Sequence, residues 1–473
     1  MTRDEVRAAA KRVVQWHGRF AGLFGRKEPQ GHSLVYLKGL MSDQKRKSVE
    51  PIALHFARAP DGTAAAQREV VALQGFLTNS PWEANDVFQE IQAVFAEELV
   101  PSTTEWPLGT VGVIDESGFK KAGTESVGVA RQWCGRLGKT ENCQVGVFLT
   151  GVTPAGVAGL DAQLFLTQKW AADRERRKKT RVPKQIKFRT KPQIALEMLR
   201  RTRATGKVQF DWIIADSLYG ASGDFLDALE GMNQRYVAEV KSNALVWTVD
   251  PATLPGATPG PKKRKKLGSY RYPEVRSVRE VAADLPADAW RPLKLREGSV
   301  GPVVFEFAVL RVWAMRHDRP GPPIWLVIRR CVDGNDVWYY VSNAEAQTPW
   351  QTLAMVTGTR FRVEEYFQDG KTHLGMADYE ARAWASWHHH MALAALAHLF
   401  VTLTKRDFKH DIPDLTLDMA MRVLRTAFAK STLSEQEAID LIDYYRERNE
   451  VARESHRKTW LAKHKRLAKE LLL

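Results

Sequence analysis

The sequence predicts an α/β fold built on a mixed sheet, with helical regions at both ends of the chain. Strand-like and helical segments alternate between residues 106 and 242, a second group of strand-like segments lies within residues 243–342, and helical periodicity dominates elsewhere. A chain of 473 residues is too long for one ordinary domain, so we expect several, each with its own core.

Residues 1–105 are expected to form a helical domain. Val6, Ala10 and Val13 recur at helical spacing in the first segment. A later segment, residues 87–99, carries an apolar stripe at the same spacing, which is typical of a helix packed on a core.

Residues 106–242 are expected to contain the mixed sheet. Three β-rich runs, "VGVID", "SVGVARQWCG" and "CQVGVFLTGV", are separated by glycine-containing turns, which is typical of consecutive antiparallel strands. They are followed by a helical run, "KPQIALEMLRRTRATG", a strand, "FDWIIAD", a helix around "GDFLDALEGM" and another strand, "RYVAEVK". This order of elements predicts an α/β domain.

A β-rich insertion is expected over residues 243–342. It opens with "DPATLPGATPGPKKRKKLG", a linker or exposed loop, and continues with the strand-like runs "PVVFEFAVLRVWAM", "PIWLVIRR" and "VWYYVSN". The chain then turns helical. We expect residues 343–400 to supply the final helices of the domain begun by residues 106–242, and residues 401–473 to form a basic helical region.

The charge of the chain favours a polyanionic partner. The net charge is +15, for which nucleic acid is the first candidate and a solvated basic surface is the alternative. Basic side chains are concentrated in residues 173–191, with ten lysines and arginines against two acids, and again in residues 262–266 and 453–469. Such stretches predict strong, salt-sensitive binding to nucleic acid.

The sequence indicates neither export nor a membrane span. The N-terminus is charged and amphipathic and lacks an apolar signal core. No stretch approaches the ~20 apolar residues that a spanning helix needs, so we expect no membrane partner. Cys134, Cys143 and Cys331 form neither a disulfide framework nor a CxxC metal pair, which indicates a reducing cytoplasm.

Two aspartates share a setting that is typical of ligand sites. Asp115 and Asp216 each end a hydrophobic strand and precede a glycine-containing turn. A carboxylate at a strand end can be reached by solvent and metal, and α/β folds bind ligands at sheet ends. The alternative is that each aspartate only starts a turn or caps a helix.

A third carboxylate, Glu364, lies in the helical run "FRVEEYFQDGK". At about 100° per residue, Arg360, Glu364 and Lys371 project within roughly 40° of one another. Glu365 points about 100° away from Glu364 and need not share its site. An adjoining apolar seam can hold the helix against the sheet. The alternative is a surface helix with ion pairs one turn apart.

Asp115, Asp216 and Glu364 together have the chemistry of a two-metal phosphoryl-transfer site. Mg²⁺ prefers hard oxygen ligands, and two such ions roughly 4 Å apart can activate a water or a 3′-hydroxyl and stabilise the leaving oxygen. We therefore expect these carboxylates to bind two Mg²⁺ ions, with Mn²⁺ as a substitute. Arg360 and Lys371 are expected to contact DNA phosphates.

Three long segments of the chain are distinctive: "VIDESGFKKAGTESVGVARQWCGRLGKTENCQVGVFLTGV", "FDWIIADSLYG" and "RFRVEEYFQDGKTHLGMADYEARAWASWHHHMALAALAHLF". Together with "FLTNSPWEANDVFQEI" they resemble the DDE transposases of bacterial insertion sequences, in particular the branch named family seven-oh-one. The resemblance implies a ribonuclease-H-like catalytic domain with a β-rich insertion before the final carboxylate. By motif, it makes Asp115 the first metal-binding carboxylate, Asp216 the second and Glu364 the third.

Related transposases carry a Tyr-Arg-Glu-Lys signature around the last carboxylate. Arg360, Glu364 and Lys371 conform to it, whereas Thr357 stands at the tyrosine position. This departure argues against a phosphate contact from a tyrosine hydroxyl and leaves the expected metal site intact. Glu116, beside Asp115, is a further acid to which the signature assigns no role.

The insertion contains four tryptophans that invite comparison with relatives that cut DNA through a hairpin. In those relatives an aromatic residue of the insertion holds a flipped base, and stacking on a base contributes ~1–3 kcal/mol. Trp290, Trp313, Trp325 and Trp338 lie in the corresponding region. We expect at most one of them to stack on a base, and the alternative for each is ordinary β-sheet core.

The resemblance implies a DNA transposase that cuts at the terminal inverted repeats of its element and joins the freed 3′-hydroxyl ends to target DNA. A homodimer assembled on double-stranded DNA is expected because one site must act on two ends. The expected location is the bacterial cytoplasm, in association with the nucleoid. A catalytically silent, domesticated DNA-binding protein and a ribonuclease-H-like nuclease without strand transfer are the two alternatives.

Overall fold

The computed structural model describes residues 2–57, 62–101, 106–256, 258–259, 270–298, 300–408, 412, 415–426 and 434–472. The basic stretch 262–266 therefore lies outside the described residues. The chain divides into two compact units. Unit 1 comprises Met1–Trp106, Val113–Gln209 and Phe361–Asn449, and unit 2 comprises Pro107–Gly112, Phe210–Arg360 and Glu450–Leu473.

The described strands confirm the mixed α/β class that the sequence predicts. Parallel and antiparallel pairs both occur among them, and helices precede and follow them along the chain. Each unit has its own run of hydrogen-bonded strands. The two units are described separately below.

Unit 1 combines a helical N-terminal part with a small group of strands. Its strands are β1 (Val111–Lys120, which begins in unit 2), β2 (Ala130–Cys134), β3 (Lys139–Thr153) and β4 (Gly156–Phe165). Its helices are α1 (Arg3–Ala21), α2 (Lys27–Met41), α3 (Val49–Phe56), α4 (Ala64–Thr78), α5 (Ala84–Glu98), α6 (Gln168–Ala172), α7 (Arg174–Lys179), α8 (Lys191–Ala204), α13 (Phe361–His373), α14 (Trp384–Asp407), α15 (Leu417–Arg425) and α16 (Glu435–Lys463, which ends in unit 2).

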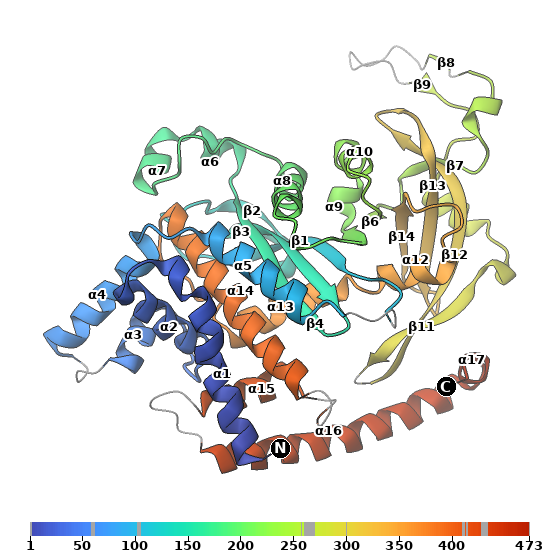
Figure 1. The fold of residues 1–473 in the computed structure, drawn as a ribbon. Coiled ribbons are helices and arrows are strands. Elements are labelled where there is room, and N and C mark those ends of the chain that lie inside the picture. The colour runs from blue at the N-terminus through green and yellow to red at the C-terminus, as the bar shows by residue number, and fades with distance from the viewer. Residues whose placement is uncertain are drawn as a thin grey trace. The chain divides into compact units, whose positions relative to one another are not determined.

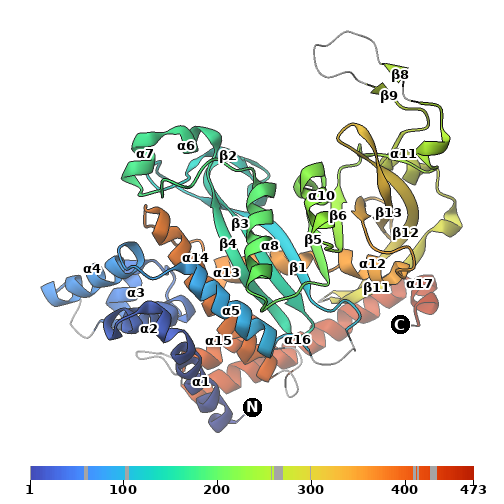
Figure 2. The same cartoon turned by 45° about the horizontal axis from the view of Figure 1, so that its top comes forward.

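The core of unit 1 lies between its strands and three helices. β3 pairs antiparallel with both β2 and β4. The helices α5 and α14 lie side by side against β4, as Figures 1 and 2 show, and α8 packs on β3 and β4. The middle of α14, from Ser386 to Thr404, is buried throughout, because this helix is apolar on nearly all sides.

Strand β4 is missing from the sequence-based prediction. Its sequence, "GVAGLDAQLF", contains two glycines and an aspartate, which are depleted in strands. Tertiary packing explains all three residues' environments: Gly156 packs beside Thr402, Gly159 lies beneath the Tyr366 ring, and Asp161 is buried against Arg201.

Unit 2 is built around consecutive antiparallel strands. Its strands are β5 (Trp212–Ala215), β6 (Tyr236–Val240), β7 (Leu245–Trp247), β8 (Thr258–Pro259), β9 (Tyr270–Arg271), β10 (Arg276–Ser277), β11 (Arg291–Gly298), β12 (Gly301–Arg316), β13 (Arg319–Cys331) and β14 (Val337–Ser342). Its helices are α9 (Ser217–Gly220), α10 (Gly223–Gly231), α11 (Val278–Ala283), α12 (Trp350–Thr357) and α17 (Lys465–Glu470).

The predicted β-rich runs of the insertion are strands β12, β13 and β14. They pair in sequence order, and β14 continues antiparallel onto β6 (Figure 1). Strand β6 is itself parallel to β5 (Figure 2). Strand β11 pairs with the free side of β12 near its start. The insertion is therefore an antiparallel meander whose last strand, β14, pairs with β6.

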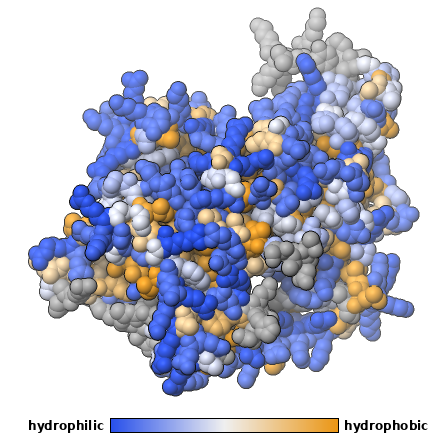
Figure 3. Space-filling view, in the orientation of Figure 1, coloured by the Kyte–Doolittle hydropathy of each residue, from blue (hydrophilic) through white to orange (hydrophobic). Residues whose placement is uncertain are grey.

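Within the described ranges, no helix combines the length and the apolar character needed to cross a bilayer. The face of the molecule in Figure 3 is mainly hydrophilic, with apolar residues in small separate groups.

Candidate active site

Asp115 lies within strand β1, which continues to Lys120. The expectation that Asp115 ends its strand is therefore wrong, because residues 116–120 stay extended although the sequence turns polar there. The Asp115 side chain is only 7% exposed, and one of its oxygens accepts a hydrogen bond from the Glu116 backbone at 2.7 Å. Its burial leaves little of the carboxylate in contact with solvent.

Asp216 follows β5 directly, as the sequence predicts. Its side chain is also the N-cap of α9, because Oδ1 accepts a hydrogen bond from the Leu218 N–H at 2.9 Å. The ligand role and the capping role that the sequence left as alternatives are thus compatible at this position. A cap fixes the side-chain rotamer, which prepares a carboxylate to bind a ligand without further loss of entropy.

Within unit 1, Asp115 and Glu116 are adjacent carboxylates of β1, and each can offer an oxygen within 4.8 Å of the other. Asp216 lies in unit 2, directly before α9. Glu116 was not assigned by the sequence, although its position beside Asp115 was the available signal.

Glu116 has a cationic partner in unit 1. Its carboxylate lies 2.6 Å from the Lys191 ammonium at the start of α8, and both side chains are largely buried, with 15% and 13% exposed. Lys191 ends the basic stretch 173–191, so at least one member of that stretch supports the acidic group from within the protein. A cation at this distance offsets part of the repulsion between neighbouring carboxylates.

Helix α13 carries Glu364 on its exposed side and packs through an apolar seam. Val363 and Phe367 are buried, and the Phe367 ring lies 5.0 Å from Phe148 of β3 in an edge-to-face arrangement. The seam predicted from the sequence therefore holds the helix against the strands. Glu364 itself is exposed.

Lys371, about two helical turns after Glu364, forms hydrogen bonds with β1. Its ammonium donates hydrogen bonds to the Ser117 hydroxyl at 2.8 Å and to the Gly118 carbonyl at 2.9 Å, and it lies over the Phe119 ring. These contacts join α13 to the strand that carries Asp115. Lys371 thus has a structural role in addition to the DNA contact that the sequence predicts for it.

The Tyr-Arg-Glu-Lys signature begins in unit 2. Thr357, at the tyrosine position, is 1% exposed, and its hydroxyl donates to the Ala354 carbonyl of its own helix at 2.7 Å. A phosphate cannot reach this hydroxyl without local unfolding. The Arg360 guanidinium lies 4.0 Å from the Glu239 carboxylate at the end of β6.

The four tryptophans of the insertion are all partly exposed. Three of them carry an arginine over the ring: Arg330 lies 3.8 Å from the centroid of Trp290, Arg311 lies 5.0 Å from Trp325, and Arg329 lies 4.5 Å from Trp338. Trp313 lies opposite Trp247 in the pairing of β12 with β7.

Those contacts bear on whether a tryptophan stacks on a base or belongs to the β-sheet core. A guanidinium already covers one face of Trp290, Trp325 and Trp338, so each could stack with a base only through its other face. None of the four is a fully buried core residue. Base stacking by one of them stays a prediction.

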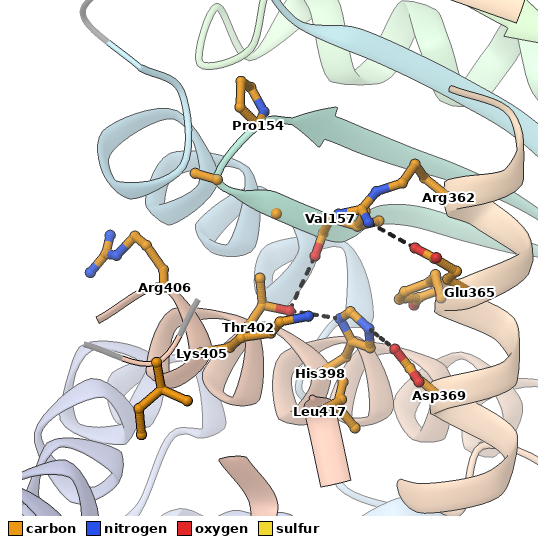
Figure 4. A pocket seen from close by; sticks show the side chains of 14 residues that line it. Pro154, Val157, Arg362, Glu365, Asp369, His398, Thr402, Lys405, Arg406 and Leu417 are labelled. Carbon is orange, nitrogen blue, oxygen red and sulfur yellow. Dashed lines mark hydrogen bonds and ion pairs between the residues drawn. The ribbon is translucent and has the colours of Figure 1, made fainter. Parts of the chain in front are cut away.

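Glu365 faces away from Glu364, into a cavity of about 240 Å³ on the other side of α13 (Figure 4). Burial lowers the pKa of His398 in this cavity to about 3, so its ring is neutral. His398 lies between Thr402, at 3.3 Å, and Asp369, at 3.9 Å. Burial raises the pKa of Asp369 to about 6.

Comparison with known proteins defines the class of this chain. A model of the family described as "DDE superfamily endonuclease" matches residues 19–302, more than half of the sequence, and the chain belongs to this family. The match confirms the resemblance noted in the sequence and includes both Asp115 and Asp216, whereas Glu364 lies beyond it.

One relative extends the comparison. The chain is 26% identical, over 342 residues, to the "Probable transposase for insertion sequence element IS701" of Microchaete diplosiphon. The aligned part covers 72% of this chain and 74% of the relative.

Proposed function

We propose that this protein is a DNA transposase that cuts at the terminal inverted repeats of its element and joins 3′-hydroxyl ends to target DNA. Membership of the DDE endonuclease family supports the nuclease chemistry. The observation that carries the proposal is the buried carboxylate of Asp115 with the Glu116 carboxylate close beside it on β1, because phosphoryl transfer by two divalent ions needs closely spaced oxygen ligands.

The donor set fits a hard divalent cation. Asp115, Glu116 and Asp216 all offer carboxylate oxygens, and such ligands favour Mg²⁺ or Mn²⁺ over zinc. We propose that Asp115, Asp216 and Glu364 hold two Mg²⁺ ions. When bound, these ions supply activation of a water or 3′-hydroxyl and stabilisation of the leaving oxygen. The protein contributes fixed carboxylates and excludes competing ligands from the buried side of Asp115.

Glu364 is proposed as the third ligand because of the course of α13 along β1. Lys371 of α13 meets Ser117 and Gly118 of β1. We propose that α13 and β1 advance in the same direction. Seven helical residues before Lys371 correspond to about 10 Å, and three strand residues before Gly118 to the same length, so Glu364 is expected at the level of Asp115.

DNA contacts are proposed for Arg360 and for the exposed members of the basic stretch 173–191. Several cations of this stretch have partners within the protein: Arg176 donates to the Thr124 carbonyl at 2.7 Å, and Lys179 pairs with Glu125. Other members are exposed to solvent, namely Arg174, Lys178, Lys184 and Lys187. This second set is better placed to neutralise phosphates. A phosphate contact of Lys371 would form in addition to its hydrogen bonds to Ser117 and Gly118 of β1.

Further parts of the proposal concern assembly. We propose that the helical region 1–105 recognises the element ends and that the region 401–473 adds phosphate or subunit contacts. A homodimer on double-stranded DNA, located in the bacterial cytoplasm at the nucleoid, would allow two ends to be processed together. Short inverted repeats flanking the gene would define the substrate.

The proposal is tested by strand cleavage of a labelled duplex that carries one terminal repeat, with Mg²⁺ and with EDTA. Wild type should cleave only with the metal, and Asp216→Ala should bind the duplex but not cleave it. Asp224→Asn is the matched control, because this aspartate lies on the neighbouring helix with its side chain 93% exposed. Its cleavage rate should equal that of wild type.

The two alternatives give different results in the same experiment. Binding without cleavage by wild type would identify a silent DNA-binding protein. Cleavage without joined products, when target DNA is added, would identify a nuclease without strand transfer. Retained cleavage by Asp216→Ala would overturn the proposed site.

A further inference from the structure

Arg329, near the end of strand β13, is surrounded by aromatic rings. Its guanidinium carbon lies 4.5 Å from the ring centre of Trp338, 4.7 Å from Phe305 and 5.4 Å from Tyr340. The cross-strand register explains this arrangement, since Trp338 is directly opposite Arg329 and the other two rings lie diagonally on β12 and β14. Three rings hold one cation in place.

The neighbouring arginines of the insertion have conventional partners. Arg330, the next residue on β13, points to the other face and donates to Glu306 at 2.7 Å. Arg311 donates to the Pro323 carbonyl at 3.0 Å. Both cations are therefore satisfied by groups of the protein itself.

Arg329 differs from both in this respect. Its Nε is buried without a hydrogen-bond partner, and within the described part of the chain no carboxylate or carbonyl oxygen bonds to its guanidinium. Cation–π contacts stabilise the charge but use none of its five N–H donors. Burying part of a cation whose N–H donors have no acceptor costs free energy, and a ligand that accepts those hydrogen bonds would offset this cost.

A phosphate group would complete this site. The guanidinium fork matches two oxygens of a phosphodiester, and the aromatic rings fix its orientation so that little entropy is lost on binding. The side chain is partly exposed, so its terminal nitrogens are within reach of a ligand. We propose that Arg329 is a DNA-phosphate contact of the insertion, pre-oriented by Phe305, Trp338 and Tyr340. This inference rests on the proposed function, because that function supplies the DNA.

The experiment measures the affinity of a fluorescein-labelled terminal-repeat duplex as a function of salt, over about 50–200 mM. Arg329→Gln should lower the slope of log K against log salt by about 0.9, which is the loss of one phosphate contact. At fixed salt its affinity should fall roughly 10-fold. Arg329→Lys keeps the charge and should keep the slope.

Arg330→Gln is the matched control, since it removes the same charge from the same strand but on the face where Glu306 pairs with it. Its slope should equal that of wild type. An unchanged slope for Arg329→Gln, or equal losses for the two variants, would overturn the inference. If wild type binds and cleaves the duplex, such a result leaves the proposed function standing, whereas failure of wild type to bind DNA at all would overturn both.

A second measurement needs no variant and is therefore independent of folding defects. Phenylglyoxal modifies accessible guanidinium groups, and mass spectrometry locates the modified residues. Arg329 should be modified in the free protein and protected when the terminal-repeat duplex is bound. Equal modification with and without the duplex would overturn the inference.

Discussion

Replacing Gly159 with alanine should displace α13, the helix that carries Glu364. A Cβ at this position would lie 2.3 Å from the Tyr366 hydroxyl oxygen and 2.8 Å from the adjoining ring carbon. Ordinary van der Waals contact begins near 3.4 Å, so the ring must retreat by about 1 Å. Tyr366 is only 2% exposed and cannot swing into solvent, so the helix itself has to move.

The magnitude follows from two known costs. Overpacking a well-packed core destabilises a protein by about 1–3 kcal/mol. Misplacing a reacting group by about 1 Å costs roughly 100-fold in rate. Gly159→Ala should therefore lower the free energy of unfolding by about 2 kcal/mol and lower strand cleavage roughly 100-fold, while binding of the duplex is preserved.

The assay compares cleavage rates on the terminal-repeat duplex with unfolding in denaturant. Gly18→Ala serves as control, because this glycine lies on α1 with no atom within 4 Å of a built Cβ, and alanine favours a helix. Adding Tyr366→Phe to Gly159→Ala removes the nearest atom and should restore part of both quantities. Wild-type cleavage and stability in Gly159→Ala would refute the reasoning.

Two further predictions concern the acids of α13. Glu364→Gln should reduce the cleavage rate by more than about 100-fold, because loss of even an outer-shell partner of a metal costs about 10- to 100-fold. Glu365→Gln should leave the rate unchanged. Equal rates for the two variants would contradict the proposed role of Glu364 as a metal ligand. The pKa of Asp369 is raised by burial to about 6, so its protonated form stabilises the folded state and this contribution is lost as the pH rises through about 6. At about pH 8 the free energy of unfolding of Asp369→Asn should therefore exceed that of wild type by on the order of 2 kcal/mol, and the difference should be smaller at about pH 5. A difference in melting temperature that does not change with pH would argue against a buried, titrating Asp369.

Much of the fold was predictable because several segments have clear patterns of apolar and β-forming residues. The runs that became β12, β13 and β14 are long and rich in β-branched and aromatic residues, and the segment that became α14 is apolar over many turns. Strand β4 was not predictable from its own residues. Its two glycines and its aspartate are explained only by partners far away in the sequence, such as Tyr366 and Arg201.

The site was predictable to a similar, limited extent. The position of Asp216 directly after β5 and the different directions of Glu364 and Glu365 on α13 could be predicted, because both depend on local backbone geometry, whereas their role as metal ligands stays a prediction. Local geometry could not indicate that Lys191 pairs with Glu116 or that Lys371 is anchored to β1, since these contacts join distant segments. It also could not distinguish basic residues that face solvent from those with internal partners.

The sequence-order pairing of β11 to β14 has a consequence for biosynthesis. A meander whose neighbours in space are neighbours along the chain has low contact order and can form quickly. Translation proceeds from the N-terminus, so this meander can be in place before residues 361–373 emerge from the ribosome. A nascent chain would then have ordered β11 to β14, which include the proposed phosphate contact at Arg329, while it still lacks Glu364, the proposed third metal ligand.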